Sequence, residues 1–366
     1  MDYSMKPRFL LVWGDRNALA ITINEIAKLC GVSRGTVDRA LHNKGNVRPE
    51  IAARIKAVAE EYGYTPNWAG MALSRASHPI RIGLVLHSVQ TPFVKLILET
   101  CRREADRLAV FSTDVIFRPS QLLDPVEQLS IIDKLVTEQQ ISGLAIMPLH
   151  SELIENKINE LAEQRHIPVI TFNTDLPQSK RLCYVGQDSY AAGRTAAALM
   201  RLVTGGKGVV SPIVGPSEHH RTYSERLSGF QKEIAQIAPQ IQLRQTDIRS
   251  DNIEDAMEAT LALLRDEPNL TGIYSITPGY EGVCKALIQT GYAHKVHVIL
   301  HDEIAANLEQ VRDGVVDFLI GQDYETQGSL PLRMLSDYIQ LHREPDKDAY
   351  YTDIRILLRH NIVGLM

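Results

Sequence analysis

The apolar residues follow different patterns on either side of residue 80. Before it, short segments that begin at Ile23, Arg34 and Pro49 carry apolar residues every three or four positions, which predicts three short helices. After it, continuous apolar runs such as 169–172 alternate with longer amphipathic stretches. Continuous apolar strands are typical of parallel sheets that helices cover on both faces. The pattern therefore predicts a small all-α domain followed by a doubly wound α/β domain.

The α/β part is long enough for two lobes. It extends from residue 80 to residue 366, which is more than one doubly wound sheet usually holds. Two lobes with separate cores leave a cleft between them, and ligands of open α/β sheets bind beyond the carboxyl ends of the strands. We therefore expect a ligand site built from residues at strand ends.

Local signals mark the ends of the first two helices. Thr22 can cap the first helix, and Glu25 three residues later completes a capping box. Gly31 ends this helix, and Ser33 caps the second one. Two short helices joined by such a tight turn predict a helix-turn-helix.

Four residues of the second helix fall outside its apolar stripe. They are Arg34, Gly35, Thr36 and Arg39, near the N-terminal half of the helix. Recognition helices contact base edges from this part, where arginine can donate two hydrogen bonds to guanine. The placement predicts that the second helix reads DNA.

Charge is distributed unevenly along the chain. Residues 21–78 carry a net charge of +3, and residues 1–20 carry +1. Because the whole chain has a formal net charge of −5, residues 79–366 carry −9. A basic N-terminal region suits a polyanion, because contacts with phosphates release counterions. Chance is the alternative explanation for so small an excess, and the motifs of the same segment decide between the two.

Three motifs stand out in this region: Gly31-Val32-Ser33 in the turn, Thr36-Val37 with Arg39 on the second helix, and Gly63-Tyr64 with Pro66-Asn67 after the third. With the residues between them, they resemble the DNA-binding domain of the lactose-repressor family. The resemblance implies a helix-turn-helix DNA-binding domain over 21–66. The residues expected to contact DNA are Thr22, Ser33, Arg34, Gly35, Thr36, Arg39, Asn43, Asn67 and Leu73.

The next segment, 67–79, corresponds to the hinge helix and linker of that family. The resemblance implies that Leu73 wedges into the minor groove, and Gly70 weakens the free helix. A plain linker with a buried leucine is the alternative. Asp38 departs from the family, which usually has serine there; it could orient Arg34, accept from a cytosine amine, or be solvated.

The strand order after residue 80 resembles the type I periplasmic sugar-binding proteins, the fold of the effector domain in lactose-repressor relatives. In that fold the chain crosses between lobes three times, which here places crossings near 184–188, 300–303 and 322–324. The first lobe is then expected to combine about 80–184 with 303–322. The second combines 188–300 with 325–366.

Polar and aromatic residues at the expected strand ends form the candidate effector site. An aromatic ring can stack on a small sugar or polyol, and an arginine guanidinium, amides and one carboxylate can form hydrogen bonds with its many hydroxyl groups. Met147, Thr174 and the pair Thr277-Pro278 stand where ribose binders have polar partners, so a ribose pocket is not expected. His87, His150 and His301 also follow strands and either bind ligand or are structural. The residues expected to bind effector are Phe93, Asn173, Arg226, Thr277, Asp302 and Gln322.

Other classes of function lack support in the sequence. There is no bilayer-length apolar run, signal peptide, nucleophile elbow or dinucleotide fingerprint. Gly205-Gly206-Lys207-Gly208 follows a helix and reads as a helix stop, and adjacent His219 and His220 make a poor metal chelate. No catalysis, metal or cofactor is expected. The four well-separated cysteines are expected to be reduced core thiols in a cytoplasmic protein.

These observations predict a sequence-specific transcription regulator, a repressor by family resemblance, which binds a pseudopalindromic operator in double-stranded DNA. It is expected to act as a homodimer, with a tetramer left open, and to respond to a sugar-like effector without contacting membranes. Two alternatives remain: a regulator controlled by a protein partner or a non-sugar effector, and a solute-binding protein with an extra domain. The sequence assigns no role to residues 1–20.

Overall fold

The computed structural model describes residues 21–41, 47–64, 79–120, 122–216, 220–362 and 364. The chain divides into two units, Met1–Met71 and Ala72–Met366, which are considered separately. Asn43, Asn67 and Leu73, expected to contact DNA, lie outside the described residues, as do residues 1–20. Within the described residues, no helix combines the length and the apolar character that crossing a bilayer requires.

The N-terminal unit contains three short helices, α1 (Ile23–Cys30), α2 (Arg34–Leu41) and α3 (Pro49–Glu61). The predicted capping box is confirmed: Glu25 N–H donates to Thr22 Oγ1 (3.3 Å), and Thr22 N–H donates to the Glu25 carboxylate (2.7 Å). Gly31 ends α1 with φ +66°, a conformation that glycine adopts without strain. The three helices pack around one small apolar core, whose fully buried members are Ile26, Val37 and Ile55.

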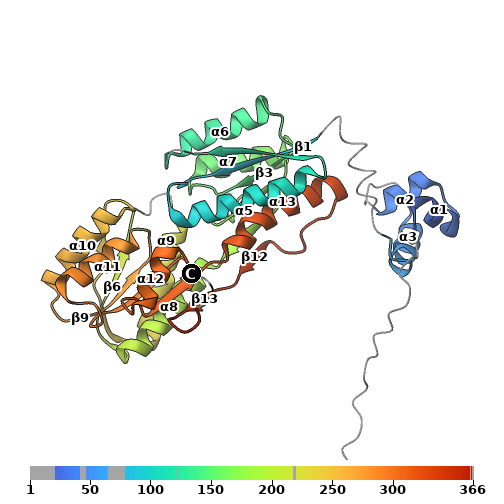
Figure 1. The fold of residues 1–366 in the computed structure, drawn as a ribbon. Helices are drawn as coiled ribbons and strands as arrows, with labels where there is room; N and C mark the ends of the chain where they lie inside the picture. Colours follow the sequence, from blue (N-terminus) through green and yellow to red (C-terminus); the bar gives the residue numbers. More distant parts are fainter. Residues whose placement is uncertain are drawn as a thin grey trace, which may run out of the picture. The chain divides into compact units, whose positions relative to one another are not determined.

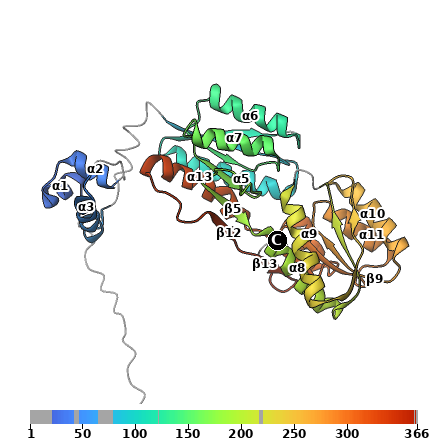
Figure 2. The same cartoon turned by 180° about the vertical axis from the view of Figure 1, so that it is seen from behind.

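The large domain (residues 80–366) has two lobes, each with one sheet between helices (Figures 1 and 2). Lobe 1 has the strand order β12-β5-β4-β3-β1-β2, all parallel. Helices α5 and α13 pack together on one face, and α6 and α7 lie on the other. Its elements are β1 (Ile80–Leu86), α5 (Pro92–Ala109), β2 (Thr113–Pro119), α6 (Pro125–Thr137), β3 (Gly143–Ile146), α7 (Glu152–Glu163), β4 (Val169–Phe172), β5 (Cys183–Gln187), α13 (Tyr324–Leu341) and β12 (Ala349–Thr352).

Lobe 2 has the strand order β13-β11-β10-β9-β6-β7, with the short β8 paired to β6. Its strands are parallel apart from β13, which runs antiparallel to β11. Helices α8 and α9 cover one face, and α10 and α11 the other. Its elements are α8 (Ser189–Thr204), β6 (Lys207–Val214), α9 (Arg221–Ile237), β7 (Gln240–Leu243), β8 (Thr246–Asp247), α10 (Ile253–Asp266), β9 (Leu270–Ser275), α11 (Tyr280–Thr290), β10 (His297–His301), α12 (Ala305–Arg312), β11 (Phe318–Gly321) and β13 (Arg355–Leu357).

The expected assignment of 303–322 to the first lobe is wrong. β11 pairs in parallel with β10, so this stretch belongs to lobe 2. The expected placement of all of 325–366 in the second lobe is also wrong, because α13 packs on α5 and β12 pairs with β5. The crossings therefore follow β5, β11 and β12, and no crossing lies near 300–303. Strand pairing decides to which lobe a segment belongs, and an apolar run does not identify the strand with which it pairs.

Close packing of α8 on α9 fixes the start of α9, which carries part of the ligand site described below. A Cβ added at Gly193 would lie 2.0 Å from the Arg226 carbonyl oxygen, and one at Gly229 would lie 2.2 Å from the Tyr190 carbonyl oxygen. Only glycine permits so close a helix crossing. The predicted helix stop is confirmed, since α8 ends at Thr204 with Gly205 in the left-handed region.

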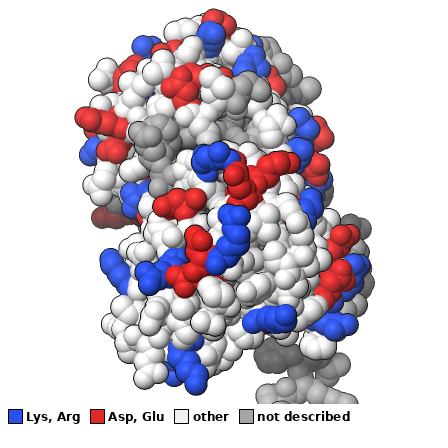
Figure 3. Space-filling model, turned by 90° about the vertical axis from the view of Figure 1, so that its left-hand side faces the viewer, with Lys and Arg blue, Asp and Glu red and all other residues white. Residues whose placement is uncertain are grey.

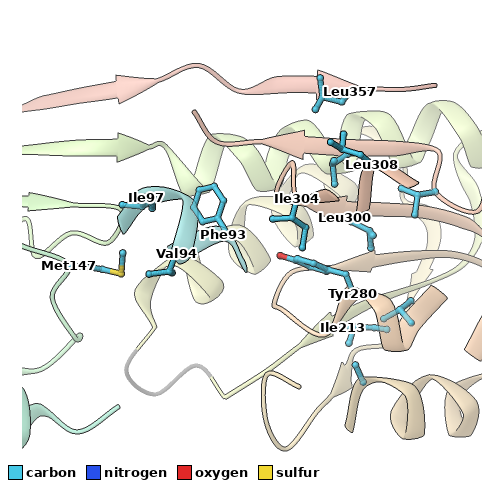
Figure 4. Packing of buried hydrophobic residues seen from close by; sticks show 14 of the residues in the cluster. Phe93, Val94, Ile97, Met147, Ile213, Tyr280, Leu300, Ile304, Leu308 and Leu357 are labelled. Carbon is cyan, nitrogen blue, oxygen red and sulfur yellow. The ribbon is translucent and has the colours of Figure 1, made fainter. Parts of the chain in front are cut away.

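Buried apolar residues of both lobes form one continuous cluster (Figure 4). Phe93 and Val94 come from lobe 1, and Tyr280 and Ile304 from lobe 2, with the Tyr280 hydroxyl directed toward the lobe that carries Phe93. The prediction of core thiols is confirmed: Cys30, Cys101, Cys183 and Cys284 are all buried and free.

Candidate functional site

A cavity between the two lobes collects polar side chains from the ends of several strands. Lobe 1 contributes the loop after β1 and the residues that follow β3 and β4, and lobe 2 contributes the first turns of α9 and α11 and the ends of β10 and β11. This first cavity is lined by His87, Ser88, Thr91, Phe93, Val94, Met147, Asn173, Thr174, His220, Thr222, Tyr223, Arg226, Pro278, Tyr280, Asp302 and Gln322.

Five of the six residues expected to bind effector line this cavity: Phe93, Asn173, Arg226, Asp302 and Gln322. Thr277 does not line it. The Thr277 side chain is fully buried inside lobe 2, and the neighbouring Pro278 reaches the cavity in its place. The structure thus brings together residues that are more than 200 positions apart in the sequence.

Arg226 is the buried cation of the cavity. Only 2% of its surface is exposed, and one guanidinium nitrogen, Nη1, donates to the Ile276 carbonyl oxygen at 3.3 Å. Nε and Nη2 are buried without a hydrogen-bond partner in the described part of the chain. A buried guanidinium is costly unless its donors are satisfied. The two donors are therefore available to acceptor atoms of a bound molecule.

Asp302 supplies the carboxylate of the same cavity. Its side chain accepts from the Gln322 amide and from the Tyr280 hydroxyl (3.2 Å), and its backbone has φ +70°. Burial raises the pKa of Asp302, and the positive charge of Arg226 opposes this rise. Such strained backbone is held only where the surroundings determine it closely. Asp302 and Arg226 together offer an acceptor and two donors, as vicinal hydroxyl groups require.

Two histidines from opposite lobes meet at the cavity wall. The His87 and His220 rings lie 5.3 Å apart in an edge-to-face arrangement, and His220 stacks on Tyr223 at 4.6 Å. His87 Nδ1 is hydrogen-bonded to Ser88 Oγ (2.9 Å), and burial lowers the pKa of His87 to about 3, so its ring is neutral at physiological pH. His301 is fully buried against the Tyr274 hydroxyl (2.7 Å) and His150 is exposed; neither lines the cavity.

A chain of amide hydrogen bonds connects the two halves of the site through the crossing after β11. The Asn173 amide donates to Gln327 Oε1 (2.9 Å), and the Gln327 amide donates to the Gln322 carbonyl oxygen. The Gln322 amide in turn donates to Asp302. Gln187 also binds this crossing by donating to the Gly321 carbonyl oxygen (2.8 Å). A ligand that contacts Asn173 and Asp302 therefore contacts groups that are hydrogen-bonded to the crossing after β11, where the chain passes from lobe 2 to lobe 1.

The second candidate site is α2 of the N-terminal unit. Arg34, Gly35 and Arg39 are exposed and Thr36 is half-buried, while Val37 on the other face is fully buried. Thr22 and Ser33 serve as helix caps here: the Ser33 hydroxyl accepts from Thr36 N–H at 3.1 Å.

Asp38 lies differently from the other polar residues of α2. It is half-buried, and together with burial its carboxylate raises the pKa of Tyr64. This placement does not fit a freely solvated side chain.

On the face drawn in Figure 3, described basic and acidic side chains are interspersed, and no broad patch of one sign is visible there. Arg34 and Arg39, which are exposed on α2, are the candidates for contacts with a polyanion.

Comparison with known families agrees with both parts of the chain. Residues 82–344 match the periplasmic binding protein domain, and residues 22–67 match the lacI family of bacterial regulatory proteins. The chain belongs to the periplasmic binding protein domain family, and its N-terminal unit is similar to the lacI family of bacterial regulatory proteins over residues 22–67. The predicted helix-turn-helix domain and two-lobed parallel α/β domain are confirmed.

Individual relatives are distant. The HTH-type transcriptional repressor PurR of Edwardsiella ictaluri is 25% identical over 224 residues, which cover 60% of this chain and 61% of that protein. PurR of Salmonella paratyphi B is 24% identical over 244 residues, or 66% of this chain and 68% of that protein. The chain thus matches about three fifths to two thirds of the length of these repressors.

Two solved structures of sugar-binding proteins share the fold of most of this chain. A glucose-galactose binding protein from Geobacillus stearothermophilus has a TM-score of 0.69 at 21% identity, covering 78% of this chain and 99% of the other. A solute-binding protein from Burkholderia graminis, in complex with D-arabinose, has a TM-score of 0.69 at 25% identity, covering 78% and 97%. These likenesses show the fold of the periplasmic binding protein domain.

Several cavity residues of this domain were missed by the sequence analysis. Ser88 and Thr91 lie in the loop after β1, and Tyr223 and Tyr280 lie in the first turns of α9 and α11. Position relative to the strands is the signal that could have found them, because loops and helix starts beyond the carboxyl ends of strands face the cleft. His220 was weighed only as a metal ligand, whereas its ring forms part of the cavity wall.

Burial of Asp251 is expected to make the stability of the large domain depend on pH. The Tyr223 hydroxyl donates to its carboxylate (2.7 Å), and burial raises the pKa of Asp251 to about 6. Because the folded state favours the protonated carboxyl of Asp251, this group stabilises the fold at low pH. The stabilisation is lost as the pH rises through the pKa of the folded state, about 6. Asp251→Asn is therefore expected to raise the free energy of unfolding at pH 7.5 by about 1 to 3 kcal/mol and to change it little at pH 4. Urea unfolding at the two pH values checks this, and equal effects at both would contradict it.

Proposed function

We propose that this protein is a transcriptional repressor that binds double-stranded operator DNA through its lacI-family head and is controlled by a small ligand in the first cavity. One observation carries the proposal: a single chain joins a helix with outward arginines to a cavity whose walls come from two lobes. A molecule bound between lobes favours one lobe arrangement, and it can change DNA affinity only if that arrangement also affects the head.

The cavity chemistry favours a sugar or polyol as the ligand. Phe93 offers an apolar ring, Arg226 has two unsatisfied donors, and Asp302, Asn173 and Gln322 add a carboxylate and amides. Burying hydroxyl groups requires a partner for each, and this set contains both donors and acceptors. The sugars named for the structural relatives, glucose, galactose and D-arabinose, support the same class. No catalytic step is proposed.

The protein is expected to act in the cytoplasm as a homodimer on a pseudopalindromic operator, since two-fold symmetric proteins read two-fold symmetric sites. Reciprocal coupling then follows from thermodynamic linkage. If the ligand binds the DNA-releasing state better, DNA must weaken ligand binding by the same factor, which is typically about 5- to 150-fold. If the ligand is instead a co-repressor, DNA and ligand strengthen each other's binding by the same factor.

Thermal unfolding against a panel of pentoses, hexoses, polyols and their phosphates tests the ligand class. A ligand at one hundred times its Kd stabilises the protein by about 2.7 kcal/mol, which raises the Tm measurably. Binding to DNA fragments selected by the protein from a random pool is then measured with and without the compound that raises the Tm most. No shift with any compound, in protein that unfolds cooperatively, would overturn the sugar-like ligand and favour control by a protein partner or a non-sugar effector.

A further inference from the structure

The first cavity holds a cation, Arg226, and a carboxylate, Asp302, that do not pair with each other. The two oxygens of Asp302 are already used: Oδ1 accepts from the Gln322 amide, and Oδ2 accepts from the Tyr280 hydroxyl. No other carboxylate of the described residues forms an ion pair with Arg226 either. A buried charge is costly unless an opposite charge and hydrogen bonds replace the lost water. The counter-ion of Arg226 is therefore expected to come from a bound molecule.

The donors of Arg226 that remain unsatisfied lie on one edge of the guanidinium. Nη1 donates to the Ile276 carbonyl oxygen, which leaves Nε and Nη2 buried without a partner among the described residues. The N–H bonds of Nε and Nη2 run parallel, and their spacing matches the two oxygens of a carboxylate. Two hydroxyl groups of a neutral sugar can also accept from this edge, but they leave the positive charge unpaired. The edge therefore fits a carboxylate better than a neutral group.

The ring of His87 contributes a further nitrogen to the cavity. The residue is 3% exposed, its Nδ1 is hydrogen-bonded to Ser88 Oγ, and its Nε2 has no partner in the described part of the chain. A neutral imidazole carries its hydrogen on either nitrogen. An acceptor oxygen at Nε2 selects the form that donates there, and the Ser88 hydroxyl then donates to Nδ1. His87 can thus join Arg226 in binding an oxygen-rich anionic group.

The amide of Asn173 is oriented so that its oxygen is left for the ligand. The Gln322 carbonyl oxygen can only accept, so the amide nitrogen of Gln327 faces it and the amide oxygen of Gln327 faces Asn173. That oxygen also can only accept, so Asn173 turns its nitrogen toward Gln327 (2.9 Å). The remaining oxygen of Asn173, like the carboxylate of Asp302, suits a hydroxyl group and not a second carboxylate.

We infer that the ligand of the first cavity is a polyhydroxy carboxylate, an aldonic or uronic acid, whose carboxylate binds the Nε–Nη2 edge of Arg226 and whose hydroxyl groups donate to Asn173 and Asp302. This inference rests on the proposed function, because it narrows the sugar-like ligand of the same cavity to its acidic members. A carboxylate supplies, in one group, the counter-ion and both acceptors that Arg226 lacks. A neutral sugar still uses Asn173 and Asp302, so it binds more weakly but does bind.

Isothermal titration calorimetry with matched pairs tests the charge of the ligand. The pairs are D-gluconate and D-glucitol, D-xylonate and xylitol, D-glucuronate and D-glucose, and D-galacturonate and D-galactose. In each pair the acid carries a carboxylate where the neutral partner carries a hydroxymethyl group. In at least one pair, the acid is expected to bind about tenfold or more tightly than its neutral partner. The amide of the same acid keeps the planar group without the charge, and it is expected to bind as weakly as the neutral partner.

Two variants separate the carboxylate contact from the hydroxyl contacts. Arg226→Gln removes the charge and the two-pronged edge, so it is expected to bring the affinities for acid and neutral partner to within about twofold of each other. Asn173→Ala is expected to weaken both compounds alike and to keep their ratio. Arg201→Gln, at an exposed arginine on α8, is the matched control and should keep both affinities. The amide comparison uses the unaltered protein, so it tests the inference whether or not Arg226→Gln folds.

The outcomes separate this inference from the proposed function. If neutral sugars or polyols bind and no acid binds more tightly than its partner, the acidic ligand is overturned and the sugar-binding proposal stands. A preference for the acid that persists in Arg226→Gln, or that the amide shares, also overturns the inference, because the charge of the ligand is then not paired with Arg226. If no compound of any pair binds, the sugar-like ligand of the proposed function fails, and the acidic ligand fails with it.

Discussion

Arg34→Ala is expected to weaken binding to the preferred DNA sequence by about 5- to 150-fold, or about 1 to 3 kcal/mol. Arg34 is exposed at the first position of α2, and the buried Val37 holds the opposite face of that helix in the core. Its guanidinium is therefore free to donate to a guanine edge in the major groove. Loss of a base contact relaxes the preference for one base pair, whereas loss of a phosphate contact weakens all sequences alike.

Fluorescence anisotropy with DNA selected by the unaltered protein from a random pool measures this effect. The salt dependence is measured in parallel, because removing a phosphate contact lowers its slope by about one and removing a base contact does not. Arg102→Ala, at an exposed arginine on α5 of the large domain, is the matched control and should leave affinity unchanged. Equal affinities for Arg34→Ala, Arg39→Ala and the unaltered protein would mean that α2 does not read DNA.

The N-terminal helices were predictable because their signals are local. Thr22 and Glu25 lie three residues apart and contact each other, and Pro49 begins α3 where its fixed φ fits. In the large domain, continuous apolar runs such as those of β1, β4 and β10 located strands for the same reason. The pairing partners were not predictable: β11 belongs to lobe 2 because it pairs with β10, and β12 belongs to lobe 1 because it pairs with the distant β5.

Part of the candidate site was predictable from the rule that ligands of open α/β sheets bind beyond the carboxyl ends of the strands. Asn173, Asp302 and Gln322 directly follow strands, and the carboxyl ends of parallel strands meet at one edge. The direction of each side chain is decided by packing, which is why Thr277 turns into lobe 2 although Pro278 beside it reaches the cavity. Gln327 lies in the first turn of α13, six residues beyond the end of β11, but its hydrogen bond joins it to Asn173, 154 positions away, and no local pattern predicts that contact.

Arg226→Met is expected to abolish the response to ligand while changing the ligand-free Tm by only a few degrees. The unaltered side chain holds two buried donors without partners and one longer bond of 3.3 Å, so the ligand-free protein gains little from the guanidinium. A bound ligand would accept from both donors. Hydrogen bonds to charged groups contribute about 1.5 to 3 kcal/mol each, so their loss predicts at least about 100-fold weaker binding.

Removing the charge also acts on Asp302, because the positive charge of Arg226 holds down the pKa of that carboxyl against burial. In Arg226→Met the pKa of Asp302 is expected to rise further, so any residual binding through its carboxylate should weaken as the pH is lowered through the new value. Arg226→Lys separates the two roles, because lysine keeps the charge near Asp302 without the two-pronged donor geometry. It should keep the pH profile of the unaltered protein and still bind weakly.

Calorimetry with the compound that raises the Tm most, at several pH values, measures both effects, and Arg201→Met on the exposed face of α8 is the matched control. Ligand binding by Arg226→Met that equals that of the control would remove Arg226 from the site. A large fall in the ligand-free Tm would instead mean that the guanidinium stabilises the fold. The predicted combination, lost binding with an unchanged fold, is expected only if the two buried donors are kept for a ligand.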